Sequence, residues 1–117
     1  MHEYFVTQQL IKIAEDELKE IKPKRVLSIK VIVGELSGII DESLKFYFDV
    51  LTKGTILEGS KLEIEQKKAL LFCNACHEYF ERTKDFLCPK CKALGKLTQY
   101  GKEFYIESIE VDDGDEN

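Results

Sequence analysis

The chain has no excess of positive charge and no long hydrophobic run. Its 17 lysines and arginines stand against 22 aspartates and glutamates, a formal net charge of −5. Bulk charge therefore argues against a general nucleic-acid binder, which needs a basic surface. No apolar stretch approaches the roughly 20 residues of a membrane-spanning helix. The first residues lack the basic and apolar regions of a signal peptide, so we expect a cytoplasmic protein in a reducing compartment.

The usual signatures of catalysis are missing as well. The sequence contains no nucleophile–base pair, no paired-carboxylate motif and no glycine-rich phosphate-binding loop. We therefore expect a protein that is not an enzyme and that cannot hydrolyse a nucleotide. Any step that consumes a nucleoside triphosphate must then come from a partner.

All four cysteines lie in one short stretch, as two C-x-x-C pairs. Cys73 and Cys76 form the first pair, and Cys88 and Cys91 form the second pair after eleven intervening residues. Each pair can make a tight turn that points two sulfur atoms at one spot. Two facing turns make a tetrahedral thiolate site, the geometry that Zn²⁺ accepts most readily. The segment between the pairs is too short to form a domain without a staple, so we expect a structural zinc ion.

Other uses of the four cysteines are less consistent with the sequence. Two disulfides would need an oxidising compartment, and nothing signals export. A redox C-x-x-C usually opens a helix after a strand, and Pro89 argues against that at the second pair. Iron in the same thiolate cage stays open, although the spacing between the pairs is short for a rubredoxin-like electron carrier.

Hydrophobic periodicity predicts two helices and several strands. The first helix covers 1–21 and ends before Pro23. The second helix covers 42–53, with Asp41 as its N-cap and Gly54 in a left-handed turn after it. The strands are predicted at 26–34, 61–65, 96–100 and 103–111, and the first of these is apolar enough to be a central strand.

This order predicts a small α+β fold. We expect a three-stranded sheet with two helices on one face, plus an inserted zinc-ribbon-like unit that carries the two C-x-x-C knuckles. The predicted α/β domain comprises 1–68 and 102–112, and the zinc-binding domain comprises 69–101. The residues from 113 to 117 read as a disordered acidic tail.

The N-terminal tripeptide offers a second type of metal site. A histidine at position two is most often only a solvated end residue. However, the α-amino group of Met1 and the backbone amide and imidazole of His2 can close two chelate rings in one plane, and a further amide or the carboxylate of Glu3 can complete the square. Planar nitrogen-rich fields suit Ni(II) or Cu(II).

Motifs spread over nearly the whole chain resemble the HypA/HybF family. They occur in the family's order and at compatible spacing: Met1-His2-Glu3-Tyr4, Val33-Gly34-Glu35-Leu36-Ser37-Gly38, the two cysteine pairs with Pro89 in the second, and Gly101-x-Glu103-x-x-Ile106-x-Ser108-Ile109-Glu110-Val111. Members of that family are nickel metallochaperones for the maturation of [NiFe]-hydrogenase and, in some organisms, of urease.

The resemblance implies roles for particular residues and partners. His2 would be the essential nickel ligand, Glu3 would lie beside it, Asp41 would lie near the site, and the four cysteines would hold structural zinc. The implied partners are a nickel-maturation GTPase, a hydrogenase large-subunit precursor and, in some organisms, urease maturation proteins. A homodimer stays open, as do the nickel affinity and the relative orientation of the two units.

Two residues depart from the family pattern. Many relatives have glycine after each knuckle, whereas His77 and Lys92 stand there in this chain. His77 is expected to be an exposed turn residue, and a minority interpretation has it tune or replace a zinc ligand.

The alternative function is a zinc-ribbon module that binds nucleic acid or a transcription partner. Between Cys73 and Lys96 five cations stand against three acidic residues, a net charge of +2. Four thiolates and one Zn²⁺ contribute −2, so the unit is close to neutral, which is a poor footprint for nucleic acid.

Overall fold

The computed structural model describes residues 3–112. The predictions for Met1, His2 and the acidic tail at 113–117 therefore lie outside the described residues. The chain divides into two compact units. Unit 1 is the described part of Met1–Ile32, Gly38–Glu65 and Tyr105–Asn117, and unit 2 comprises Val33–Ser37 and Gln66–Phe104.

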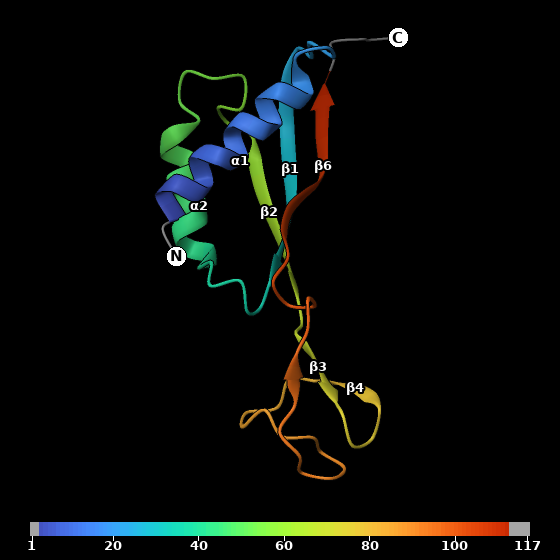
Figure 1. Ribbon diagram of the computed structural model, residues 1–117. Coiled ribbons are helices and arrows are strands. Elements are labelled where there is room, and N and C mark those ends of the chain that lie inside the picture. Colours follow the sequence, from blue (N-terminus) through green and yellow to red (C-terminus); the bar gives the residue numbers. More distant parts are fainter. Residues whose placement is uncertain (1–2, 113–117) are drawn as a thin grey trace. The chain divides into compact units, whose positions relative to one another are not determined.

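Unit 1 is built on a three-stranded sheet with two helices on one side of it (Figure 1). The strand order is β2-β1-β6. The elements are α1 (Glu3–Leu18), β1 (Arg25–Gly34), α2 (Asp41–Leu51), β2 (Lys61–Lys67) and β6 (Phe104–Asp112). The predicted α+β class, with two helices and a small sheet, is confirmed.

The core of unit 1 lies between the central strand and the helices. Ile29 and Val31 on β1 are fully buried, as are Leu44 on α2 and Ala14 on α1. The other side of the sheet carries charges, because the Lys30 ammonium lies 3.0 Å from the Glu65 carboxylate and 3.3 Å from that of Glu107. One covered face and one wet face explain why the helices lie on the same side.

The start of α2 differs from the prediction by one residue. Asp41 is the first residue of the helix, and Ile40 is the N-cap, since the Leu44 N–H donates to its carbonyl at 3.0 Å. The Ile40 side chain cannot accept a hydrogen bond. The Ile40 N–H instead donates to a carboxylate oxygen of Glu3 at 3.0 Å, so an acidic residue from the other helix acts as the glutamate of a capping box would.

Both helices end earlier than the periodicity suggests. The first ends at Leu18 rather than Ile21, and Lys22 before Pro23 has a left-handed φ of +48°. The second ends at Leu51, and Gly54 has the predicted left-handed backbone, with φ +82°.

Unit 2 contains a second three-stranded sheet, with β3 (Leu70–Cys73) between β4 (Glu78–Glu81) and β5 (Lys96–Leu97). Both neighbours pair with β3 antiparallel. The last strand has two residues instead of the predicted five. The chain turns after it, where the Thr98 hydroxyl donates to the Leu70 carbonyl and accepts from the Tyr100 N–H.

Three segments of unit 2 cross where two glycines leave no room for side chains. The Gly34 N–H donates to the Glu103 carbonyl, and the Leu36 N–H donates to the Gly101 carbonyl, both at 2.7 Å. A Cβ on Gly34 would overlap the Gly101 carbonyl. A Cβ on Gly101, whose φ is +109°, would lie 2.6 Å from the Ala69 Cβ. Glycine is therefore required at both positions.

Within residues 3–112, no helix has the length and apolar character needed to span a bilayer.

Candidate metal centre

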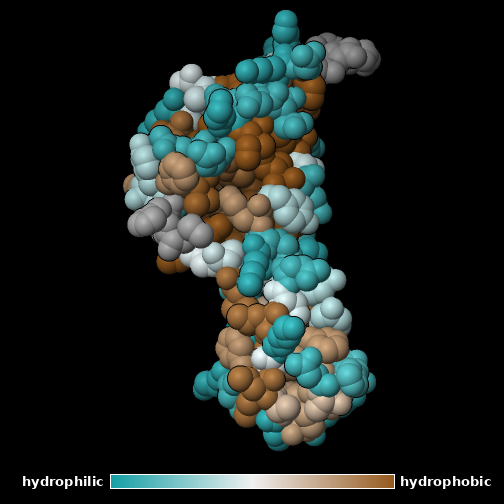
Figure 2. Space-filling view, in the orientation of Figure 1, coloured by the Kyte–Doolittle hydropathy of each residue, from teal (hydrophilic) through white to brown (hydrophobic). Residues whose placement is uncertain are grey.

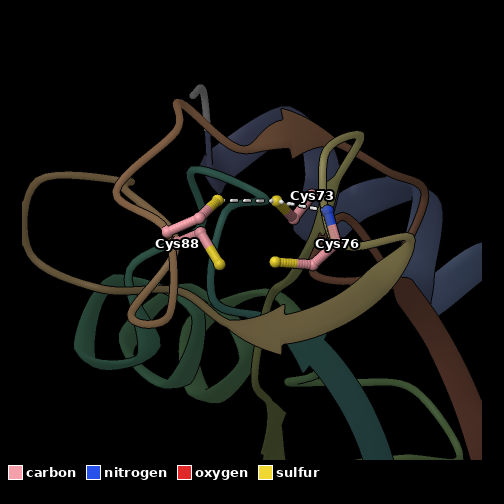
Figure 3. Close-up of side chains that lie close together, drawn as sticks. Cys73, Cys76 and Cys88 are labelled. Atoms are coloured by element: carbon pink, nitrogen blue, oxygen red, sulfur yellow. Dashed lines mark hydrogen bonds between the residues drawn. The ribbon is translucent and has the colours of Figure 1, made fainter.

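The four cysteine sulfurs of unit 2 meet at one place. Their sulfur atoms all lie within 4.8 Å of one another, and the Sγ atoms of Cys73 and Cys91 are 3.4 Å apart. All four are free thiols rather than disulfides. Figure 3 shows the sulfurs of Cys73, Cys76 and Cys88 directed towards a common space.

The two C-x-x-C turns close with the same backbone hydrogen bond. The His77 N–H donates to the Cys73 carbonyl at 2.7 Å, and the Lys92 N–H donates to the Cys88 carbonyl at 2.8 Å. Both donors have left-handed backbones, with φ +57° at His77 and +66° at Lys92. The knuckle geometry thus forms although neither residue is glycine, with a conformational cost at each turn.

Backbone N–H groups inside the turns stabilise sulfur in its ionised form. The Cys76 N–H donates to the Cys73 sulfur at 3.3 Å. The Cys91 N–H lowers the pKa of the Cys88 thiol to about 7, against the opposing effect of desolvation, and the Lys90 N–H adds to the lowering. Hydrogen bonds with Cys91 and then Cys73 raise the pKa of the Cys76 thiol to about 12. Because the four thiols are adjacent, they cannot all ionise without a cation between them. A divalent cation would take the place of the thiol protons.

The spacing of the sulfurs fits a tetrahedral metal ion. Zn–S bonds of about 2.3 Å place the sulfurs of a tetrahedron about 3.8 Å apart. The separations in unit 2 lie around this value, and soft thiolates select zinc or iron among the common metals. Cys73 and Cys88 are buried, whereas Cys91 is exposed, so the site has one open side.

Two contacts brace the turns against each other. The Lys90 ammonium in the second knuckle lies 2.6 Å from the Glu78 carboxylate just after the first. Gly95 lies against the ring of Phe80 and the side chain of Leu71, where an added Cβ would be only 2.5 Å from the ring.

The structure places two further predicted site residues together in unit 1. Glu3 is 9% exposed, and its carboxylate accepts the Ile40 N–H. Asp41 follows Ile40, and its Oδ1 atom is buried. The acidic groups predicted near a nickel site therefore lie at the start of α1 and the start of α2. His2 and Met1 themselves lie outside the described residues.

His77 does not belong to the cluster of potential metal ligands in unit 2. It is exposed, and among residues 3–112 the one group of potential metal ligands consists of the four cysteines. Its interpretation as an exchangeable zinc ligand stays a prediction.

The sequence reasoning did not find the role of Glu35 in unit 2. Its carboxylate accepts hydrogen bonds from the Ala69 N–H at 2.5 Å and from the Arg82 guanidinium at 2.8 and 3.3 Å. The Ala69 N–H, and then Arg82, lower the pKa of Glu35. Arg82 also lies over the Phe86 ring, 5.6 Å from its centroid. The signal was available, since Glu35 is the one charged residue in the Val33–Gly38 motif.

Fold and site together define a small α+β metal-binding protein with a four-thiol centre. The family model described as "Hydrogenase/urease nickel incorporation, metallochaperone, hypA" matches residues 1–111. The chain therefore belongs to this family of nickel metallochaperones, as the motifs predicted.

Curated relatives and solved structures agree with this assignment. A "Hydrogenase maturation factor HypA" from Caldanaerobacter subterraneus subsp. tengcongensis is 46% identical over 114 residues, which cover 96% of this chain and all of the relative. One from Dehalococcoides mccartyi is 35% identical and covers 97% of this chain and 96% of its own length. The solution structure of the Ni metallochaperone HypA from Helicobacter pylori has a TM-score of 0.66 at 27% identity, covering 96% of this chain and 98% of that one.

Proposed function

We propose that this chain binds Ni(II) at its N-terminus and delivers it during the maturation of a nickel enzyme. The nickel ligands are the α-amino group of Met1, the amide and imidazole of His2, and the carboxylate of Glu3. The recipient is a hydrogenase large-subunit precursor, a nickel-maturation GTPase is the partner, and urease maturation proteins are a second destination. The chain works in the cytoplasm, and it passes nickel on by ligand exchange.

One observation supports the N-terminal site. The Ile40 N–H donates to the Glu3 carboxylate and so holds the first described residue at the N-terminus of α2. Asp41 lies at the same end of that helix. A cation bound by the preceding residues would therefore have acidic groups beside it, which favours retention of Ni(II).

In this proposal, zinc has a separate and permanent role. Cys73, Cys76, Cys88 and Cys91 hold Zn²⁺, which supplies a rigid tetrahedral crosslink and takes no part in nickel transfer. The cluster fits this role by its four sulfur ligands and their separations.

Nickel titration of the untagged, zinc-loaded protein tests the site. The chain has two histidines, so His77→Ala is a matched control for His2→Ala. We expect His2→Ala to abolish specific Ni(II) binding and His77→Ala to keep it, with zinc content and circular dichroism unchanged in the first variant. An N-terminal extension should act like His2→Ala, because it removes the free amine. Wild-type nickel affinity in either altered protein would refute the N-terminal site.

Variants of Glu3 separate metal binding from helix capping. Glutamine can still accept the Ile40 N–H but carries no charge, whereas alanine can do neither. If Glu3 is a ligand, both Glu3→Gln and Glu3→Ala weaken nickel binding, while only Glu3→Ala lowers the melting temperature of unit 1. Unchanged nickel affinity in Glu3→Gln would limit Glu3 to its capping role.

Partner binding distinguishes delivery from the zinc-ribbon alternative. The chain should associate with a nickel-maturation GTPase and show no salt-sensitive affinity for duplex DNA. Submicromolar DNA binding that weakens steeply with salt would instead favour a nucleic-acid module.

A further inference from the structure

One ion pair joins the two cysteine knuckles of unit 2. Lys90 stands between the cysteines of the second knuckle, and its ammonium group lies 2.6 Å from the carboxylate of Glu78. Glu78 begins β4, where it is the cross-strand partner of Cys73. The contact therefore links the second knuckle to the β3–β4 hairpin that carries the first knuckle, across 12 residues of the chain.

The pair lies beside the most exposed of the four cysteines. Cys91 follows Lys90 and is exposed, whereas Cys73 and Cys88 are buried. Figure 2 shows hydrophilic and hydrophobic side chains next to one another on the surface of unit 2. The Cys88 N–H donates to the Ala93 carbonyl at 2.8 Å, so this backbone hydrogen bond holds the second knuckle to its own segment. A side-chain contact that reaches β4 is therefore well placed to hold the knuckle over the open side of the centre.

The charge of Lys90 also suits this position. Four thiolates around one divalent cation carry a net charge of −2. The hydrogen bond with Glu78 raises the pKa of Lys90, and the charges of Cys76 and Cys88 add to the rise, against the opposing effect of desolvation. The Lys90 and Glu78 side chains are 66% and 54% exposed, so the pair contributes little to the equilibrium stability of unit 2. Such a contact can still limit a rate, because a ligand must pass it to reach the centre.

We propose that the Lys90–Glu78 pair is a latch over the open side of the thiolate centre, which slows the exchange of the bound metal with outside ligands. These ligands are soluble thiols and chelators, and they enter at Cys91. Cys91 gives up its bond to the metal as the incoming ligand forms one, and the released sulfur takes up a proton from water. The pair must open for this approach, so it limits the rate in both directions and leaves the equilibrium affinity nearly unchanged. This inference rests on the proposed structural zinc.

Zinc transfer from the untagged, zinc-loaded protein to a chromogenic chelator tests the latch. Lys90→Gln and Glu78→Gln each remove one charge and keep a polar side chain. We expect either variant to release zinc about three to five times faster than the wild type, which is the size of effect that an exposed ion pair allows. The zinc affinity measured by equilibrium competition should stay within about twofold of the wild type, because the latch acts on the rate.

Two matched variants carry the same substitutions away from the latch. Lys92→Gln removes a cation that directly follows the second knuckle, and Glu81→Gln removes an exposed carboxylate from β4. Both should release zinc at the wild-type rate. Lys90→Glu combined with Glu78→Lys restores a pair of opposite charges, so this double variant should return towards the wild-type rate although each single reversal speeds release.

The possible failures can be told apart. Wild-type release rates in both Lys90→Gln and Glu78→Gln would overturn the latch. A loss of equilibrium affinity as large as the gain in rate would make the pair an ordinary stabilising contact. A double reversal that releases zinc faster than either single reversal would refute the pairing of the two charges. A wild-type chain that holds no zinc would refute the proposed zinc role itself, and the latch with it.

Discussion

The two units of this chain are held together in different ways. Unit 1 fills the space between its helices and sheet with large side chains that are fully buried, among them Phe48, Ile29, Ile32 and Leu57. The buried apolar residues of unit 2 are far fewer and include two of the metal-site cysteines; they are Val33, Ala69, Leu71, Cys73 and Cys88. A hydrophobic core stabilises the first unit, whereas we propose that the second depends on a metal ion and on tight backbone packing.

The different ways of stabilising the two units match the different roles proposed for nickel and zinc. A metal that holds a fold together cannot leave without unfolding it. Nickel, the cargo, is proposed to bind at the unit whose core does not depend on a metal, so it can be released while the protein stays folded. Zinc is proposed to stay in unit 2 and to be required for the folding of that unit.

Removing zinc should have the largest effect and should separate the two units most clearly. Cys88→Ala should lose the metal and the protected backbone amides of β3, β4 and β5, because binding and folding are linked there. Amides of α1 and β1 should stay protected. Hydrogen exchange with parallel zinc analysis measures both. Near-full zinc content in Cys88→Ala would refute the four-cysteine site.

A core substitution in unit 1 should have the opposite effect: it should destabilise unit 1 and leave zinc bound in unit 2. Phe48→Ala should destabilise unit 1 by about 3–5 kcal/mol, because it leaves a cavity around a fully buried ring. Phe46→Ala, two residues away on the exposed side, is the control and should cost far less. Thermal unfolding and zinc content give the readouts. Zinc loss in Phe48→Ala at a temperature where unit 1 is still folded would contradict the independence of the two units.

The Glu35 carboxylate gives unit 2 a smaller, pH-dependent contribution. Hydrogen bonds from the Ala69 N–H and Arg82 lower its pKa below the ordinary value of 4.5. The stabilisation is therefore fully present above pH 4.5 and is lost as the pH falls through the lower, folded-state pKa. We expect Glu35→Gln to remove this part of the acid sensitivity, because glutamine does not titrate.

Zinc release also occurs in acid, so the Glu35 measurement needs a reference. Glu81→Gln is the matched control, because it changes a more exposed carboxylate on β4 that pairs with Lys68 at 3.5 Å. Comparing the two variants by chemical denaturation between pH 3 and 6 isolates the contribution of Glu35. Identical profiles for the two would refute it.

The left-handed turn at His77 should show the smallest effect. A β-branched residue is poorly tolerated at φ +57°, so His77→Val should weaken zinc retention by about 1–2 kcal/mol. His77→Gly should hold zinc at least as well as the wild type, since glycine adopts this backbone without strain. Competition with a chromogenic chelator measures the difference. Weaker zinc binding in His77→Gly would favour a direct role for the imidazole.

Much of the fold could be predicted because local patterns and tertiary packing agree. The apolar run of β1 indicated a central strand, and the sheet order places β1 between β2 and β6. Two C-x-x-C pairs could be expected to meet because each turn is specified locally. The structure does bring their sulfurs together.

The errors arise where distant residues decide the local structure. Asp41 looked like an N-cap, but Glu3 supplies the acceptor from 37 residues away. The role of Glu35 depends on Ala69 and Arg82, 34 and 47 residues further along the chain. Hydrophobic periodicity within a short stretch of sequence cannot reveal such long-range contacts. The strand predicted at 96–100 is shorter than expected for a similar reason, because the Thr98 hydroxyl donates to the Leu70 carbonyl.

Parallel nickel and zinc analysis of two variants tests the separation of the two metals most directly. Untagged His2→Ala should lose nickel and keep a full complement of zinc. Cys88→Ala should lose zinc and keep the nickel capacity of the wild type, because its N-terminal site belongs to the unit with its own core. Loss of both metals in Cys88→Ala, or retention of nickel in His2→Ala, would contradict an N-terminal nickel site that is independent of the thiolate centre.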